Sequence, residues 1–420
     1  MRVLKMCVLF ALLGASALAR ADVIAIVGAR AYTAADAAPI KRATIVIRDG
    51  VITAVGDVDD ISVPKDAEII DGSKKVVVAG FWNSHVHLLQ EPYRNAARQP
   101  AEVLAKALET HFGRWGFTTI FDISSLPGDA LALRRRIADG ELIGPQILTV
   151  DAPFFPEHGT PIYVKDLLTQ LQVPSFEVKD AAEARARATQ QLSDGADGVK
   201  VFAGAIVGGD VGVLPMEVAI ARAAIDQAHR VGKYAFAHPT NEAGLQVALD
   251  SGVDVLAHTT PTAAPWTKPF ARQLAEKNIA VIPTLTLIEI EVTRDGAPAE
   301  FLARIMANAS QQVKQAQDAG APLLFGTDAG YIDVYAPLRE YQLMAKAGLN
   351  WRQILSSLTT QPSARFGQGK RKGRIAVGMD ADLVVLTADP ARDVDAFAKV
   401  DMTIRAGKII HRSARSQKAD

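Results

Sequence analysis

The sequence predicts an α/β protein in which a (β/α)8 barrel of the TIM type is joined to a smaller β-sandwich domain. Two observations predict this fold. Between residues 77 and 370, short apolar runs alternate with longer segments of helical periodicity, as in parallel strands that are connected by helices. On both sides of this region, short strand-like segments are separated by turns instead.

Residues 22–76 are expected to form the N-terminal part of the β-sandwich domain. Asp49-Gly50 separates two runs of β-branched and apolar residues, 45–47 and 51–55, which is a strong signal for a tight hairpin. Residues 371–420 return to short strands and are expected to complete the same domain, with a frayed polar end at 413–420.

Eight apolar runs are candidate barrel strands: 76–81, 118–123, 146–150, 198–202, 234–238, 253–258, 280–284 and 323–327. The segments between them carry helical periodicity, and several end in a glycine, which is a common helix stop: Gly116, Gly195, Gly232, Gly252 and Gly320. Strand number does not establish closure, so a doubly wound open sheet remains the alternative.

Residues 1–21 have the pattern of a secretory signal peptide. Arg2 and Lys5 precede an apolar run at 6–18, and Ala19-Arg20-Ala21 offers a cleavage site. We therefore expect a periplasmic or secreted protein with no stable membrane insertion after cleavage; a retained N-terminal anchor is the alternative. The only cysteine, Cys7, lies in this segment, so any metal in the mature chain needs nitrogen and oxygen ligands.

The composition indicates an ordinary globular protein. Apolar residues make up 49% of the 420 residues and charged residues 22%, and the formal net charge is zero. A nucleic-acid partner is not expected, because such proteins usually carry a concentrated basic face.

Polar residues close five of the candidate barrel strands. Catalytic groups of a barrel come from the carboxyl ends of its strands, so these residues would meet at one mouth although they are far apart in sequence. They are His85, His87, Lys200, His238, His258 and Asp328.

The His85-x-His87 pair has a simple geometry. Side chains alternate along a strand, so both imidazoles share a face, with Cα atoms roughly 6–7 Å apart. Alone, such a pair can also be two histidines near a loop. The alternatives for the other residues are buried core histidines for His238 and His258, and a helix N-cap for Asp328.

Lys200 is unusual because it interrupts the apolar run 198–202, and lysine is rarely buried without a partner. A cation beside metal ions is unfavourable. N6-carboxylation would make Lys200 anionic and give it two oxygens that could bridge two metals. The alternative is a lysine that pairs with a carboxylate.

The six residues, in this order and on these strands, resemble the amidohydrolase superfamily. Residues 49–56 and 373–386 also resemble its N-terminal hairpin and C-terminal return, so the likeness covers nearly the whole mature chain. Within the superfamily, the chain is most similar to the imidazolonepropionase-like and prolidase-like hydrolases.

The resemblance implies two divalent metal ions, zinc being the usual one. His85 and His87 would bind the more buried ion, carboxylated Lys200 would bridge both, and His238 and His258 would bind the second. Asp328 would bind the first ion and act as general base and then acid, while a metal-bound hydroxide attacks the carbonyl. Relatives are often oligomers, so a homo-oligomer is possible.

Four further residues are candidates for substrate binding. His158-Gly159 resembles a His-Gly element that contacts substrate in these relatives, although its surroundings depart from the glycine-rich form. Tyr93 and Tyr331 would flank an apolar group, and Arg94 could hold a substrate carboxylate, a role that Arg294 could also take.

These features favour hydrolysis of an amide bond in a small molecule such as a dipeptide or an N-acyl amino acid. A mononuclear deaminase or a cyclic amide or amidine hydrolase is the first alternative; Glu242 is compatible with it, but Lys200 argues against it. A non-catalytic binding protein on a barrel scaffold is the second alternative, and it would tolerate the loss of a ligand.

Overall fold

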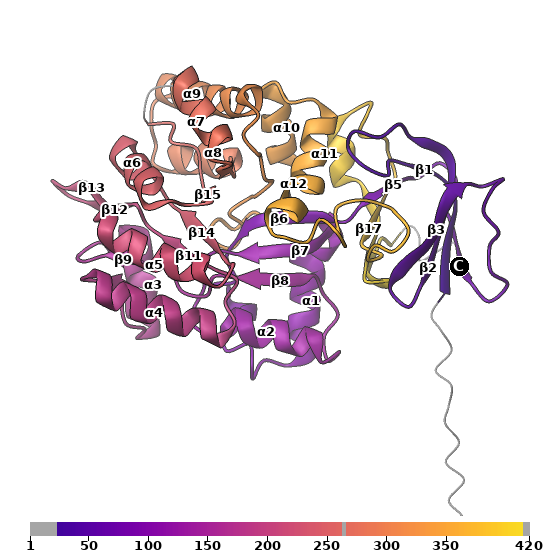
Figure 1. The fold of residues 1–420 in the computed structure, drawn as a ribbon, viewed down its shortest axis with the longest axis horizontal. Coiled ribbons are helices and arrows are strands. Elements are labelled where there is room, and N and C mark those ends of the chain that lie inside the picture. Colours follow the sequence, from indigo (N-terminus) through magenta and orange to yellow (C-terminus); the bar gives the residue numbers. More distant parts are fainter. Residues whose placement is uncertain (1–22, 263–265, 415–420) are drawn as a thin grey trace, which may run out of the picture.

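The computed structural model of the protein describes residues 23–262 and 266–414. The predicted signal peptide with Cys7, and the end of the polar C-terminal segment, lie outside these residues. Figure 1 shows a large body of helices and strands beside a smaller body of β-strands. None of the described helices is both long and apolar enough to cross a membrane.

The smaller body is one hydrogen-bonded sheet of eight strands, built from both ends of the chain (Figure 1). Its order is β19-β18-β17-β5-β1-β2-β3, with β4 paired to β1. Strands from the N- and C-terminal segments thus share a single sheet, where a sandwich was predicted. The strands are β1 (Val23–Ala31), β2 (Ile40–Arg48), β3 (Val51–Asp57), β4 (Glu68–Asp71), β5 (Val76–Ala79), β17 (Leu383–Leu386), β18 (Val400–Arg405) and β19 (Lys408–Arg412).

Two tight hairpins shape this sheet. Asp49 and Gly50 have φ values of 51° and 79°, so the predicted turn between β2 and β3 has both central residues left-handed, as a type I′ turn requires. Ala406 and Gly407 form a similar turn between β18 and β19. The two turns touch, because a Cβ on Gly50 would lie 2.8 Å from the carbonyl oxygen of Ala406.

The larger body contains two parallel sheets. One is β6-β7-β8 and the other is β11-β14-β15-β16. The chain passes between the two bodies at Gly80, because β5 belongs to the smaller one. The strands are β6 (Phe81–Val86), β7 (Phe117–Asp122), β8 (Gln146–Thr149), β11 (Gly198–Val201), β14 (Tyr234–Ala237), β15 (Val255–Leu256) and β16 (Ala280–Val281).

The eighth predicted strand, 323–327, is not a regular strand. It makes only isolated parallel bridges, Val281 with Leu323 and, just beyond it, Val86 with Ala329. The amide of Leu324 still donates to the Val281 carbonyl at 3.0 Å, and the amide of Ser84 donates to the Phe325 carbonyl at 2.7 Å. The segment therefore runs between β16 and β6 and holds the chain leading to Asp328 against both.

Helices follow the strands, as the periodicity predicts, and several end at the predicted glycines: Gly195, Gly252 and Gly320 are left-handed C-caps. Two short strand pairs lie in the connections. The pair of β12 (Gly204–Gly208) and β13 (Gly212–Pro215) is antiparallel, and the pair of β9 (Phe155–Pro156) and β10 (Glu177–Val178) is parallel. The α-helices are α1 (Ala101–His111), α2 (Asp129–Ala138), α3 (Ile162–Leu171), α4 (Ala181–Asp194), α5 (Val218–Arg230), α6 (Glu242–Ser251), α7 (Lys268–Glu276), α8 (Leu285–Arg294), α9 (Ala299–Ala319), α10 (Leu338–Lys346), α11 (Trp351–Leu358) and α12 (Thr360–Arg365).

Candidate metal centre

The six residues singled out in the sequence lie at or just beyond strand ends. His85 is the next-to-last residue of strand β6 and His87 follows the strand. Lys200 is within β11, and His238 and His258 follow β14 and β15. His85, Lys200 and Asp328 are each at most 3% exposed, His87 and His258 are nearly as buried, and His238 is partly buried. The strand ends therefore bring polar groups into an interior where they need partners.

Four of the six side chains form a tight cluster around the Asp328 carboxylate. Its oxygens lie 2.8 Å from Nε2 of His87, 3.4 Å from Nε2 of His85 and 3.5 Å from Nε2 of His258. The Nε2 atoms of His85 and His87 are 3.2 Å apart. Two ligands about 2.1 Å from a tetrahedral cation lie about 3.4 Å from each other. The donor atoms thus have the spacing of ligands to a shared metal ion.

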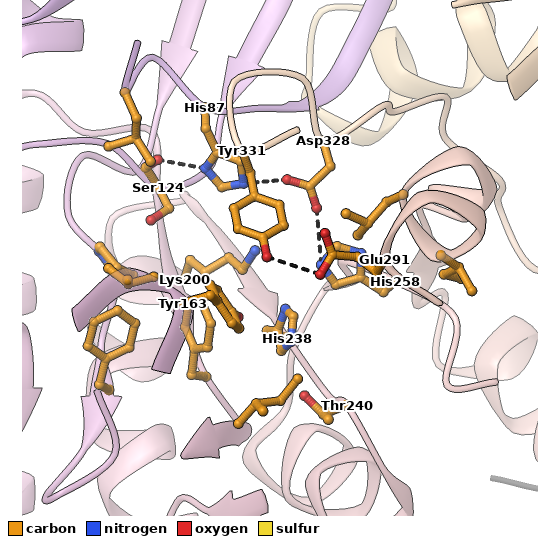
Figure 2. Close-up of a pocket in the computed structure, with 18 of the residues that line it drawn as sticks. His87, Ser124, Tyr163, Lys200, His238, Thr240, His258, Glu291, Asp328 and Tyr331 are labelled. Atoms are coloured by element: carbon orange, nitrogen blue, oxygen red, sulfur yellow. Dashed lines mark hydrogen bonds and ion pairs between the residues drawn. The ribbon is translucent and has the colours of Figure 1, made fainter. Parts of the chain in front are cut away.

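His238 and Lys200 lie next to this cluster. The ring of His238 lies 4.6 Å from that of His258 and stacks on Phe202 at 4.7 Å. The Nζ atom of Lys200 is 5.4 Å from the Phe202 ring centre. In Figure 2 the amino group of Lys200 points toward the histidines and Asp328. All six predicted residues are therefore neighbours in space.

On two of the histidines, a hydrogen bond at Nδ1 fixes the ring proton there and leaves Nε2 unprotonated. Nδ1 of His87 lies 2.6 Å from the carbonyl oxygen of Ser124, which can only accept, so the proton sits on Nδ1. Nδ1 of His258 lies 2.7 Å from the hydroxyl of Thr284, and that hydroxyl donates its proton to the Pro283 carbonyl at 2.8 Å. Thr284 thus accepts from His258. Both rings present an Nε2 lone pair to the cluster, which is the arrangement of metal-binding histidines.

Burial controls the charges here. It lowers the pKa of His85 and His238 well below the ordinary value, and the positive charge of Lys200 lowers both further. The pKa of His258 is likewise lowered, first by burial and then by His238 and Lys200. These imidazoles are neutral at pH 7, which is the form that binds metals.

The Lys200 amine is also shifted. Burial lowers its pKa to about 8, although the negative charges of Asp328 and Asp122 oppose the shift. A sizeable share of this amine is neutral near pH 7–8. Neutral imidazoles, a carboxylate and no sulfur make a nitrogen and oxygen donor set, and the grouping of His85, His258 and Asp328 within 4.8 Å fits a divalent cation such as Zn²⁺.

The backbone around Asp328 is constrained to place its carboxylate. Asp328 has a left-handed φ of 61°, and its amide donates to the His85 carbonyl at 2.9 Å. A Cβ on Gly330 would lie 1.7 Å from the His87 carbonyl oxygen, so only glycine lets this loop pack against β6. The helix N-cap alternative for Asp328 is not what the structure contains, since α10 begins ten residues later, at Leu338.

Asp122 is a buried carboxylate beside the cluster that sequence reasoning missed. It accepts hydrogen bonds from Ser125 and Thr149 hydroxyls at 2.6 Å each, and from the amide of Leu88 at 3.1 Å. Burial raises its pKa despite these bonds. Asp122 therefore ties the segment after His87 to the next two strands.

A cavity of about 300 Å³ opens beside the cluster and is lined by His87, Lys200, His238, His258 and Asp328. Its other walls are mostly apolar. They come from one face of α3, one face of α8, the start of α9 and three phenylalanines, Phe155, Phe176 and Phe202. The arrangement suits a small molecule with an apolar group next to a metal-activated water.

Tyr331 is the only one of the four predicted substrate-binding residues that lines this cavity. Its hydroxyl donates to Oε2 of Glu291 at 3.2 Å, and its ring lies 5.1 Å from that of Tyr163 (Figure 2). Burial raises the pKa of Tyr331 to about 12, so it is a neutral donor.

The other three candidates lie elsewhere, which corrects their predicted positions. Tyr93 is fully buried and its hydroxyl pairs with Nδ1 of His111 at 2.8 Å. Arg94 donates to the Leu89 carbonyl at 2.8 Å and to Glu91. His158, with a φ of 60°, is held through its amide by Glu177 and lines a separate pocket.

Glu291 and Thr284 are the main site residues that sequence reasoning missed. A signal was present in α8, where residues at positions i, i+1, i+4, i+5 and i+8 all line the cavity. They are Leu287, Ile288, Glu291, Val292 and Asp295.

Known proteins resemble the chain along most of its length. It is 24% identical to ochratoxinase from Aspergillus niger over 402 residues, which is 86% of this chain and 81% of that protein. A structure described as a prolidase from Bifidobacterium longum superposes with a TM-score of 0.77 at 25% identity, covering 94% of this chain and 98% of that one. A Xaa-Pro dipeptidase structure with bound methionine superposes with a TM-score of 0.78 at 22% identity, over 93% and 100% of the two chains.

The family model of the amidohydrolases matches residues 76–410, which include every residue of the cluster. This match extends over far more than half of the chain. The protein therefore belongs to the amidohydrolase family, a family of metal-dependent hydrolases.

Proposed function

We propose that the protein is a binuclear metal-dependent hydrolase that cleaves an amide bond in a small molecule with an apolar group, such as a dipeptide or an N-acyl amino acid. The observation that carries the proposal is the spacing of 2.8–3.5 Å between Asp328 and the Nε2 atoms of His85, His87 and His258. Family membership supports hydrolysis of carbon–nitrogen bonds.

We further infer that the two parallel sheets belong to one closed (β/α)8 barrel. On one side, the segment around Leu323 bridges β16 and β6. On the other, the Phe154 amide donates to the Lys200 carbonyl at 2.8 Å and the Phe154 carbonyl accepts from the Phe202 amide at 2.9 Å, which connects the segment that follows β8 to β11. Closure would explain why six residues from five strand ends share one mouth.

Each ligand has a place in this proposal. His85, His87 and Asp328 would hold the more buried ion, and His238 and His258 the second. Lys200, carboxylated on Nζ, would bridge the two. Its low pKa of about 8 supports carboxylation, because only the neutral amine can attack CO₂, forming the N–C bond and releasing one proton to solvent.

Two divalent ions in this site would supply an activated water at neutral pH and polarise the substrate carbonyl. Asp328 would accept a proton from that water as it attacks the carbonyl carbon, and would then deliver the proton to the amine nitrogen as the C–N bond breaks. Ser124 and Thr284 hold His87 and His258 in the tautomer that this arrangement needs. The apolar walls exclude other water from the reacting bond.

The apolar walls also support the choice of substrate. Phe155, Leu168 and Phe202 present buried hydrocarbon to the cavity, so an apolar side chain would gain free energy by entering it. The names of the relatives, an ochratoxinase and a Xaa-Pro dipeptidase, are compatible with amide hydrolysis in small molecules.

We also propose that the protein is exported, because residues 1–21 have the pattern of a secretory signal peptide. N-terminal sequencing of protein from the periplasm or medium should begin at Asp22, and a start at Met1 would contradict it. The expected domain division at 22–76, 77–370 and 371–420 is proposed with its first boundary moved to Gly80, because β5 belongs to the smaller sheet. A homo-oligomer is also proposed.

The test of the proposed function is a screen of the zinc-loaded enzyme against apolar dipeptides and N-acyl amino acids, with release of free amine as the readout. Turnover that disappears on dialysis against a chelator and returns with Zn²⁺ is expected. Failure to release amine from any of these compounds would contradict it.

A further inference from the structure

We propose that Glu291 receives the free α-ammonium group of the substrate, so that the site selects aminoacyl amides over acyl amides that lack an α-amine. This inference rests on the amide hydrolysis proposed above. It concerns the acyl side of the scissile bond, which the apolar walls alone do not specify.

The first observation is the state of the Glu291 carboxylate. Glu291 lies on the cavity face of α8, and its Oε2 is engaged by Tyr331 at 3.2 Å and by Arg294 at 2.5 Å. Its Oε1 is buried and has no hydrogen-bond partner among the described residues. A buried carboxylate oxygen without a donor is costly, so a ligand that brings an N–H group would be favoured.

The second observation is position. Figure 2 shows the Glu291 carboxylate pointing into the cavity toward His258 and Asp328, which line the same cavity at the candidate metal centre. In an aminoacyl amide, the α-nitrogen is only about 2.5 Å from the carbonyl carbon. A carboxylate at the edge of the candidate metal centre, where the carbonyl would bind, is therefore placed to reach the α-ammonium group, and not a group at the distal end of the substrate.

The third observation is the charge of the cavity. Among the described lining residues that are not proposed metal ligands, the charged groups are Glu291 and Asp295, and both are acidic. Arg294 is not among the residues that line the cavity, and its side chain is 56% exposed and already paired to Glu291. The cavity is thus suited to a cationic group beside the reacting carbonyl, and offers no buried arginine to an anionic one.

A matched set of three compounds tests this directly. L-Phenylalanyl-L-alaninamide, 3-phenyllactoyl-L-alaninamide and 3-phenylpropanoyl-L-alaninamide carry an ammonium, a hydroxyl or a hydrogen on the same α-carbon. Cleavage of each is measured as kcat/KM with the zinc-loaded enzyme. Binding is measured separately as Kd, with ketomethylene analogues in which a CH₂ replaces the amide N–H and hydrolysis is impossible.

The ammonium compound should exceed the hydrogen compound by about tenfold or more in kcat/KM, and the Kd of its ketomethylene analogue should be lower by about tenfold or more, with the hydroxyl compound between them in both measurements. Glu291→Gln should remove most of this preference while still binding the hydrogen analogue, which also reports that the variant is folded. Glu289→Gln is the matched control. It removes a carboxylate from the same helix that pairs with Arg339 outside the cavity, and it should keep the preference.

The inference is overturned if the hydrogen compound binds as well as the ammonium compound, if the ammonium analogue does not bind, or if the preference persists in Glu291→Gln. Persistence would assign the preference to direct binding of the amine by the metals. If the Kd values follow the expected order but nothing is cleaved, the proposed hydrolysis is wrong and the assignment of Glu291 is supported.

Discussion

The hydroxyl of Thr284 lies 2.7 Å from Nδ1 of His258 and gives its own proton to the Pro283 carbonyl. It therefore fixes the tautomer of His258 and directs the Nε2 lone pair to the candidate metal centre. Thr284→Val keeps the side-chain shape and removes this acceptor. We expect metal affinity to fall by about 10- to 100-fold, as measured by competition with a chromogenic chelator.

Thr259→Val is the matched control for Thr284→Val. Thr259 follows His258 directly, and its buried hydroxyl has no hydrogen-bond partner among the described residues. Its loss should leave metal affinity within about twofold of the original. Equal affinities in the two variants would show that the Thr284 hydroxyl does not orient His258.

Asp328→Asn should lower kcat by about 10²- to 10⁴-fold, because the amide cannot take up and deliver the proton. The fold should survive, since the Asp328 backbone is held through its amide by the His85 carbonyl. The decrease in kcat is measured from the rate of amine release at saturating substrate. Asp333→Asn, an exposed carboxylate on the same loop, should keep full activity, and a kcat for Asp328→Asn within tenfold of the unmodified enzyme would exclude the proposed proton transfer.

Lys200→Ala should abolish activity, and bicarbonate or a short carboxylic acid should restore part of it by occupying the space of the carbamate. Because the pKa of Lys200 is near 8, carboxylation of the unmodified enzyme should increase as the pH rises through that value. Carbon-13 NMR after incubation with labelled bicarbonate follows the carbamate. Undiminished turnover in Lys200→Ala would rule out a bridging role.

Glu340 should make stability depend on pH. Its buried carboxylate accepts the amides of Leu285 and Thr286 at the start of α8, at 2.9 and 2.7 Å. Burial nevertheless raises its pKa to about 7, from an ordinary value of 4.5. Between these values the folded chain keeps a proton that the unfolded chain has released, so this stabilisation is full below about pH 4.5 and is lost as the pH rises through 7.

Glu340→Gln removes this titration. The free energy of unfolding of the original protein, relative to that of the variant, should fall by on the order of 3 kcal/mol between pH 4 and 8. Denaturant unfolding of metal-free protein across this range provides the measurement, because it removes the pH dependence of metal binding. Parallel stability profiles for the two proteins would mean that Glu340 does not titrate in this range.

Much of the fold could be predicted because local periodicity reflects burial. Six of the eight candidate strands are strands of the two parallel sheets, and the Asp49-Gly50 turn lies where its residues demand left-handed backbone. The first candidate, 76–81, falls mostly on β5 of the smaller sheet, and the strand that carries His85 is β6. The prediction that 323–327 forms a regular strand was wrong, because this segment makes isolated bridges instead of a continuous ladder. Its apolar residues reflect burial, which a strand and an irregular buried segment share.

The gathering of His85, His87, Lys200, His238, His258 and Asp328 could be predicted because parallel strands end on one side. The residues whose role depends on a contact between distant parts of the chain could not be predicted. Glu340 meets Leu285 across 55 residues, and Thr284 meets His258 across 26, with no local pattern to mark either pair. Tyr93 and His158 were misplaced because a short 3-10 helix buries the first and Glu177 holds the turn of the second away from the cavity.

The most direct test of the account is the metal content of the purified protein, measured by inductively coupled plasma mass spectrometry after loading with Zn²⁺ and removal of free metal. The six-residue site, with Lys200 as bridge, predicts two ions per chain, falling to one or fewer in Lys200→Ala. A protein that retains a single ion, and retains it equally in Lys200→Ala, would contradict the binuclear centre.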